Sequence, residues 1–165
     1  YPGTLEVRIV EKKPFAIWQH GSELTIVEKD GSPIAPLVSG RHASLPVVIG
    51  MGAAQQGAAF IAIVAKYPVL AGQVVAYSHI AERRWDLRLE NGMTVKLPEH
   101  GEDEALRDLL ALDHRYGLLS RDIETVDMRF ADRLVVKLTP DAAVAREAAL
   151  KERLGKNYRP AERHI

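Results

Sequence analysis

The sequence has 165 residues, of which 47% are hydrophobic and 27% are charged. This composition is typical of one globular domain with its own core, with room for a small piece of a second domain, and it excludes an intrinsically disordered chain. The 22 basic and 22 acidic side chains balance, so net charge gives no argument for nucleic acid or an anionic membrane surface as a partner. The absence of cysteine excludes a disulfide framework and thiolate zinc sites.

No apolar run reaches the roughly 18 residues that a membrane-spanning helix needs. The chain opens with Tyr1-Pro2-Gly3 and carries neither an initiator methionine nor a signal peptide. We therefore interpret it as a fragment, and we expect any membrane anchor or targeting segment to lie upstream.

The first fifty residues have strand-like patterns. Apolar and polar residues alternate in 5–10 (LEVRIV), 15–19 (FAIWQ) and 23–28 (ELTIVE). The segment 32–40 (SPIAPLVSG) contains two prolines and is expected to be an irregular crossing. The short apolar run 45–50 (LPVVIG) is consistent with a buried strand.

The middle of the chain changes from helical to strand periodicity. An alanine-rich helix is expected over 53–70, followed by strands at 73–80, 85–90 and 93–98. Only Asn91-Gly92 separates the last two strands, which predicts a hairpin whose two-residue turn has positive φ at both positions. The alternation of 85–90 places Trp85, Leu87 and Leu89 on one face and Asp86, Arg88 and Glu90 on the other.

A second helix is expected over 101–117, then strands at 123–130 and 133–138 joined by a tight turn or bulge at Ala131-Asp132. An exposed helix at 142–154 and a frayed tail follow. The predicted fold class is α+β, a mostly antiparallel sheet with two main helices.

No motif points to catalysis. The six histidines lack metal-ligand spacing and no nucleophile elbow occurs, so we expect neither a metal nor a cofactor. Gly50 and Gly52 resemble part of a phosphate-binding loop, although a tight strand-to-helix turn explains them as well. The acidic cluster 102–104 could chelate a cation or simply begin a helix. Arg83 and Arg84 could bind an anion or form a solvated or structurally paired face.

The last predicted strand is expected to lie at a sheet edge, and it is unusually apolar for an unprotected one. A partner strand could complete this edge by β-augmentation. The alternative is that the tail or another strand already covers it.

Five segments in order resemble the extracytoplasmic part of the FtsQ/DivIB cell-division family. They are YPGTLEVRIVEKKPFAIW, DGSPI, LPVVIG, RRWDLRLENGMTVKLPE and VDMRFADRLVVKL, and together they run from residue 1 to about 138. The resemblance implies the last strands of a POTRA domain in residues 1–20, a β domain in 21–138, and a C-terminal helix and flexible tail in 139–165.

The resemblance also implies function. Family members are non-enzymatic divisome scaffolds of the bacterial inner membrane with this part in the periplasm. They bind FtsB and FtsL, and through them FtsW and FtsI. The β domain would receive an extended segment of FtsB along its last strand. The implied partner-binding residues, taken position by position, are Arg83, Arg84, Phe130, Asp132, Leu134, Val135, Val136 and Leu138.

Two positions depart from the family pattern. The turn Ala131-Asp132 lacks a glycine, and Leu138 stands where some relatives carry tryptophan, so we expect main-chain pairing to persist and anchoring at Leu138 to change. The competing interpretation is a POTRA-associated periplasmic chaperone or transport module that binds extended peptides at the same edge.

Overall fold

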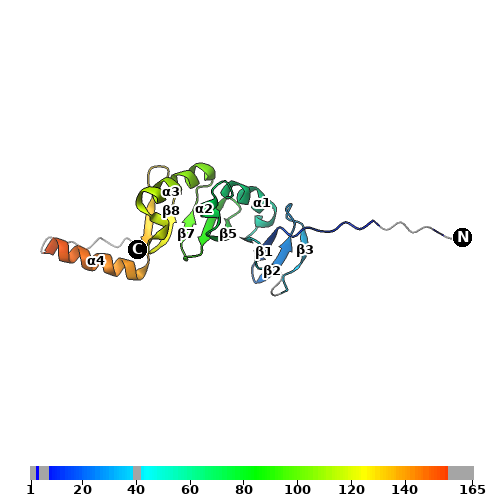
Figure 1. Ribbon diagram of the computed structural model, residues 1–165, viewed down its shortest axis with the longest axis horizontal. Helices are drawn as coiled ribbons and strands as arrows, with labels where there is room; N and C mark the ends of the chain where they lie inside the picture. The colour runs from blue at the N-terminus through cyan, green and yellow to red at the C-terminus, as the bar shows by residue number, and fades with distance from the viewer. Residues whose placement is uncertain (1–2, 4–7, 39–41, 156–165) are drawn as a thin grey trace.

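The computed structural model describes residues 3, 8–38 and 42–155 and contains one nine-stranded sheet with helices packed on it (Figure 1). The strands are β1 (Ala16–His20), β2 (Glu23–Val27), β3 (Pro33–Pro36), β4 (Val47–Ile49), β5 (Val74–Ile80), β6 (Arg84–Leu89), β7 (Thr94–Lys96), β8 (Ile123–Asp127) and β9 (Val135–Leu138). The helices are α1 (Ala53–Val64), α2 (Pro68–Ala71), α3 (Glu102–Tyr116) and α4 (Pro140–Leu154), with a 3-10 turn at Leu118–Ser120.

The strands lie in the order β3-β2-β1-β4-β5-β6-β7-β8-β9. Three neighbouring pairs are parallel, namely β1 with β4, β4 with β5 and β7 with β8. The other five pairs are antiparallel. The predicted α+β class with a mostly antiparallel sheet is confirmed, and α1 and α3 are its two main helices.

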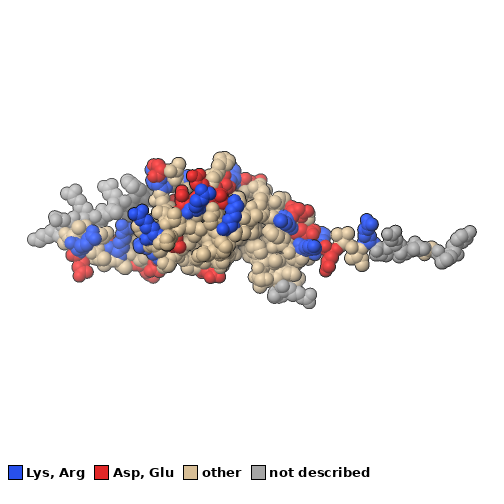
Figure 2. All heavy atoms as spheres, turned by 45° about the horizontal axis from the view of Figure 1, so that its top comes forward, with Lys and Arg blue, Asp and Glu red and all other residues tan. Residues whose placement is uncertain are grey.

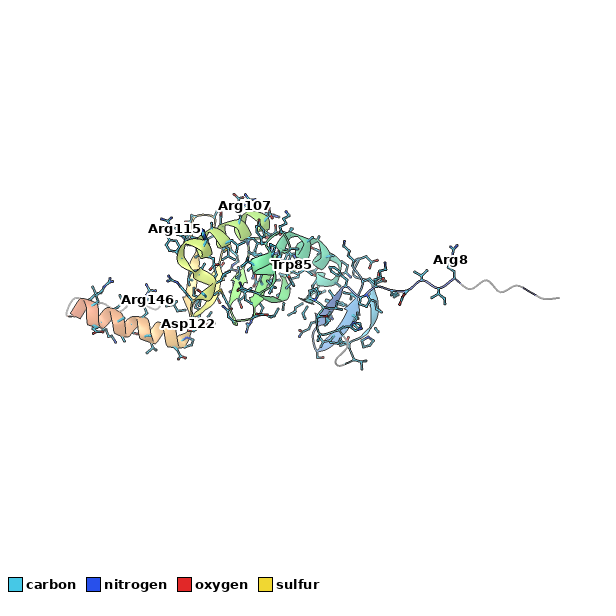
Figure 3. The ribbon with its side chains drawn as sticks, in the orientation of Figure 1. Arg8, Trp85, Arg107, Arg115, Asp122 and Arg146 are labelled. Atoms are coloured by element: carbon cyan, nitrogen blue, oxygen red, sulfur yellow. The ribbon has the colours of Figure 1, made fainter. Side chains whose placement is uncertain are left out.

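The apolar core includes the face of β6 that the alternation predicted. Trp85, Leu87 and Leu89 are all buried. Trp85 is stacked between Phe60 of α1, at a ring separation of 4.6 Å, and His79 of β5, at 4.4 Å. The tryptophan of the RRW segment is therefore a core residue, and Figure 3 shows it in the middle of the molecule.

The helix predicted over 53–70 is interrupted. Pro68 has no N–H to continue α1 and disfavours helical backbone in the preceding residue. Tyr67 accordingly has φ −119° and ψ 77°, and the separate helix α2 begins at Pro68.

The turn of the predicted hairpin at Asn91-Gly92 differs from the prediction. At Asn91-Gly92 only Gly92 has positive φ, at 84°, and its N–H donates to the oxygen of Leu89. The connection is therefore a three-residue loop ending in glycine, a common alternative to the two-residue turn. Positive φ at two successive residues occurs instead in the β5–β6 turn, at Ala81 (51°) and Glu82 (56°).

The prediction of an irregular crossing at 32–40 is wrong in part, because Pro33–Pro36 forms β3 and pairs with β2. The predicted division at residue 20 passes through one sheet, since β1 pairs with both β2 and β4. Residues 16–20 thus share a sheet with the segment after them. The assignment of residues 1–20 to a POTRA domain stays a prediction.

The two ends of the described chain extend away from the sheet (Figure 1). Residues 8–10, the described part of the strand predicted at 5–10, have no regular structure, and Ile9 and Val10 are exposed. The predicted C-terminal helix forms as α4 and none of its residues is buried in the described structure. The tail after residue 155 lies outside the described residues.

Candidate partner-binding edge

Strand β9 is the last strand of the sheet. It pairs with β8 on one side, and no strand in the described part of the chain pairs with its other side. Val135 and Val136 are exposed at 43% and 36%, while Leu134 and Leu138 are half-buried. Among the described residues, β9 is therefore an apolar edge strand with one side unpaired by any strand.

The direction of the β9 amides follows from one hydrogen bond. The N–H of Thr139 donates to the oxygen of Asp122, next to β8. Backbone groups of an antiparallel strand point alternately toward its two sides. The N–H groups of Val135 and Lys137 therefore point to β8, whereas those of Val136 and Leu138 point to the open side and are available to an added strand.

The opposite edge of the sheet is built differently. Strand β3 begins at Pro33 and ends at Pro36. Proline has no N–H to donate, and edge strands commonly use it to prevent pairing with other chains. Strand β9 contains no proline, so the two edges differ in their capacity to accept a strand.

The connection from β8 to β9 carries the predicted Phe130 and Asp132. Phe130 is 41% exposed, and the guanidinium carbons of Arg133 and Arg129 lie 4.8 and 6.0 Å from its ring centre. Asp132 is exposed and pairs with Arg133 at 3.4 Å. An exposed aromatic ring between two guanidinium groups is thus placed beside the start of the edge strand.

A row of charged side chains crosses the sheet to this connection. Asp86 of β6 is in register with Lys96 of β7, and Lys96 is in register with Asp127 of β8. The three share the face opposite Leu87, because side chains alternate along each strand. Arg84, two residues before Asp86, joins the row at one end, and Arg129 pairs with Asp127 at the other.

The pKa values of the two buried carboxylates of this row, Asp86 and Asp127, are shifted in opposite directions. Burial raises the pKa of Asp86, although the charges of Arg84, Lys96 and Arg129 oppose this effect. Its Oδ1 lies 3.6 Å from Arg84 Nε, too far for a hydrogen bond, and neither atom has a hydrogen-bond partner among the described residues. Side-chain hydrogen bonds from Arg129 lower the pKa of Asp127.

The predicted basic pair is divided. Arg83 lies in the β5–β6 turn and is exposed, whereas Arg84 begins β6 and its side chain is only 26% exposed. Two strands separate β6 from β9, so the pair does not lie on the edge itself. Arg84 belongs to the row of charges that leads toward the edge.

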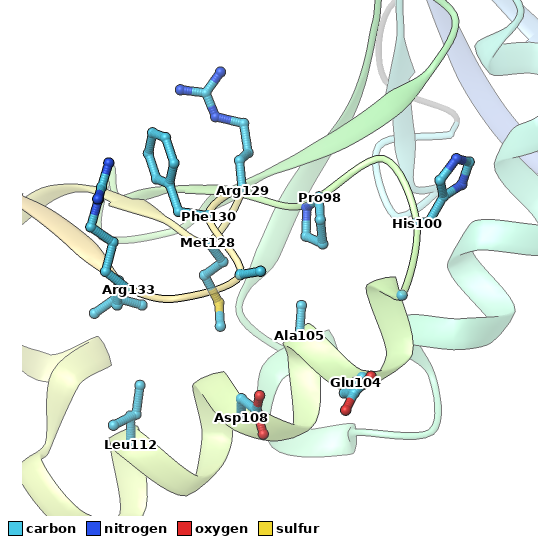
Figure 4. Close-up of a pocket in the computed structure, with 13 residues that line it drawn as sticks. Pro98, His100, Glu104, Ala105, Asp108, Leu112, Met128, Arg129, Phe130 and Arg133 are labelled. Atoms are coloured by element: carbon cyan, nitrogen blue, oxygen red, sulfur yellow. The ribbon is translucent and has the colours of Figure 1, made fainter.

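A groove of about 520 Å³ opens between α3 and the β8–β9 connection (Figure 4). Ala105 and Leu112 of α3 face Met128, whose side chain points toward the helix. Arg129 and Phe130 point away from α3 in the same view. Sequence reasoning did not find this groove, because its walls come from two separate segments of the chain, 98–112 and 128–134.

The other sequence motifs have structural roles. Gly50 and Gly52 have φ of 105° and 69° in the turn from β4 to α1, and a Cβ at Gly50 would lie 2.5 Å from the oxygen of His79. The acidic cluster forms the first turn of α3, where Asp103 pairs with Lys66 at 3.1 Å and Arg107 at 3.3 Å. No group of three or more potential metal ligands occurs among the described residues.

Charges on the visible molecular face are interspersed (Figure 2). Basic and acidic side chains are mixed on this face. Across the described residues, no helix has the length and apolarity to span a membrane.

Sequence reasoning missed four members of the charge row. Asp86, Lys96, Asp127 and Arg129 look like ordinary outward residues of separate strands. The spacing of Asp127 and Arg129, two residues apart at a strand end, was the one local signal. Their alignment with Asp86 depends on the parallel pairing of β7 with β8, which no local pattern reveals.

Known proteins similar to this chain belong to the family that the five sequence segments resemble. The family model described as "Cell division protein FtsQ/DivIB, C-terminal" matches residues 16–129. "Cell division protein FtsQ" of Rhizobium radiobacter is 47% identical over 153 residues, which cover 93% of this chain and 73% of the relative. The same-named protein of Agrobacterium fabrum is also 47% identical, over 93% of this chain and 48% of its own length.

A more distant sequence relative gives the same result. "Cell division protein FtsQ" of Caulobacter vibrioides strain NA1000 is 32% identical over 82% of this chain and 45% of its own length. The chain therefore spans about half the length of several curated relatives. The major extracytoplasmic domain of the cell division protein DivIB from Geobacillus stearothermophilus is 15% identical, with a TM-score of 0.41 over 66% of this chain and 97% of that structure. On the family model and the sequence relatives, this chain belongs to the FtsQ/DivIB family of cell division proteins.

Proposed function

We propose that this chain is a non-enzymatic scaffold of the divisome that binds FtsB, and FtsL with it, by accepting a strand of FtsB on the open edge of β9. Through these partners it links early division proteins to FtsW and FtsI and so to septal peptidoglycan synthesis. The proposal places the chain in the periplasm, held at the inner membrane by an anchor upstream.

The observation that carries this proposal is the open apolar edge of β9. The amides of Val136 and Leu138 point outward, and the prolines of β3 limit the other edge. Main-chain pairing along an edge supplies affinity, and side-chain pockets on alternate positions supply specificity. The arginines around Phe130 and the exposed Arg83 support a partner segment that carries carboxylates.

Calorimetric titration with the periplasmic segment of the FtsB homologue tests the proposal. The decisive variant is Val136→Pro, which removes an outward N–H, with Val136→Thr as the matched control that keeps it. Val135→Pro is less suitable, because the N–H of Val135 points to β8 and its loss would disrupt the sheet. Circular dichroism checks that each variant is folded.

We expect the wild type and Val136→Thr to bind, and Val136→Pro to lose at least about tenfold in affinity. Arg83→Glu should weaken binding, and Arg88→Glu, an exposed arginine on β6, should not. Equal binding by folded Val136→Pro would contradict strand addition at this edge. Weak binding of many unrelated extended peptides would instead favour the peptide-binding chaperone or transport module.

A further inference from the structure

We infer that Asp127 is a positioning residue for partner binding: its buried carboxylate fixes Arg129 so that the free side of the guanidinium faces the carboxylate of a partner segment at the β9 edge. This inference rests on the proposed function and deepens it. Asp127 and Arg129 lie in the segment VDMRFADRLVVKL but are not among the partner-binding residues that the resemblance implies.

Asp127 makes three hydrogen bonds to one residue. Its Oδ1 accepts from the backbone N–H of Arg129 at 3.1 Å and from Nε at 2.8 Å, and its Oδ2 accepts from Nη2 at 2.5 Å. The two side-chain bonds form a bidentate pair, which defines the plane of the guanidinium as well as its distance. The backbone bond spans two residues and turns the chain where β8 ends.

The carboxylate of Asp127 is mostly buried, whereas the guanidinium of Arg129 is partly exposed. Asp127 is 8% exposed, whereas the side chain of Arg129 is 37% exposed. A guanidinium has five N–H donors, and Asp127 occupies only the donors on one edge. Figure 4 shows Arg129 and Phe130 pointing away from α3 beside the same connection. The donors that remain are therefore held in place before any partner arrives.

Prior fixation has a thermodynamic consequence. A free arginine loses rotamer freedom when it is immobilised in an interface, and a fixed one has already lost most of it. Asp127 itself is supported by the charge of Lys96, its register partner on β7. Loss of Asp127 should thus weaken binding through Arg129 and not by a contact of its own.

A double-mutant cycle distinguishes an effect of Asp127 through Arg129 from a direct contact of Asp127 with the partner. Binding of the whole chain to the periplasmic FtsB segment is the measured quantity. Asp127→Asn keeps an oxygen for the backbone N–H of Arg129 but loses the bidentate pair. We expect Asp127→Asn and Arg129→Ala each to weaken binding about tenfold, and the double variant to be no weaker than Arg129→Ala alone. Asp103→Asn, an ion-paired carboxylate on α3, is the matched control and should bind like the wild type.

Two results would overturn the inference. One is wild-type affinity in folded Asp127→Asn while Arg129→Ala is impaired. The other is additive losses in the double variant, which would mean that the two residues act independently. A second readout needs no partner: the Nε–H signal of Arg129 in NMR spectra should exchange slowly in the wild type and rapidly in Asp127→Ala, which removes Oδ1, the acceptor of that N–H.

The second readout also separates this inference from the proposed function. If the wild type does not bind the FtsB segment, the proposed function fails and the role of Asp127 in binding fails with it. Slow exchange of the Arg129 Nε–H would then still establish the fixation itself. If the signal exchanges equally fast in both proteins, the inference fails even where binding is normal.

Discussion

Two residues of the β5–β6 turn adopt a backbone conformation that their side chains disfavour. Ala81 and Glu82 have φ of 51° and 56°, and left-handed backbone costs an L-residue about 1–2 kcal/mol. Neither residue is a glycine or asparagine, so the residue types at these positions do not predict positive φ. The same turn carries the exposed Arg83 of the proposed interface.

Replacing Glu82 with glycine should stabilise the protein by about 1 kcal/mol, because glycine adopts positive φ without a Cβ clash. Urea unfolding of Glu82→Gly measures the gain. Glu90→Gly, at an exposed position with negative φ, is the control and should lower stability by about 0.5–1 kcal/mol. Equal losses in both variants would mean that the turn is not strained.

The opposite pKa shifts of Asp86 and Asp127 predict opposite effects of amide substitution on stability. A raised pKa means that the ionised form of Asp86 is disfavoured in the folded state, so Asp86→Asn should raise the free energy of unfolding at pH 7. A lowered pKa means that ionised Asp127 stabilises the fold above the unfolded-state pKa, so Asp127→Asn should lower it.

The difference in free energy of unfolding between each variant and the wild type should become smaller at acidic pH. The penalty at Asp86 disappears as pH falls through its raised pKa to the unfolded value of about 3.9. The stabilisation at Asp127 is lost as pH falls from that value through its lowered pKa. Urea unfolding at pH 7 and at successively lower pH measures both, and effects of the same sign at pH 7 would contradict the account.

At the scale of elements, periodicity predicted most of the structure. The core face of β6, the helix of 101–117 and the exposed helix near the C-terminus all appear as expected. Strand β3 was missed because its two prolines are typical of loops, yet proline is compatible with an edge strand. The break in α1 and the three-residue hairpin loop depend on single residues, Pro68 and Gly92.

Helix α4 should unfold locally while the sheet stays folded. Its N-cap is Thr139, whose Oγ1 accepts from the N–H of Ala142 at 3.3 Å, and none of its residues is buried in the described structure. Thr139→Ala should cost the helix about 1 kcal/mol and speed amide exchange within it, while the urea midpoint of the sheet stays unchanged. Thr139→Ser, which keeps the hydroxyl, is the control. A fall in the sheet's midpoint would show that α4 belongs to the cooperative core.

At the scale of the whole molecule, the sequence predicted the fold class and the edge position of the last strand. It did not predict which strands are neighbours across the sheet. The parallel pairing of β7 with β8 aligns Asp86, Lys96 and Asp127, and the packing of α3 near the β8–β9 connection forms the groove. Both features join segments that are distant in the chain, and local pattern carries no information about such contacts.

The most direct test of the central claim is amide hydrogen exchange along β9, measured by NMR with and without the FtsB segment. In the free protein, the amides of Val135 and Lys137 should be protected by β8, and those of Val136 and Leu138 should exchange rapidly. Addition of the segment should protect Val136 and Leu138. If the segment binds while these two amides keep exchanging at the free rate, the partner does not add a strand to this edge.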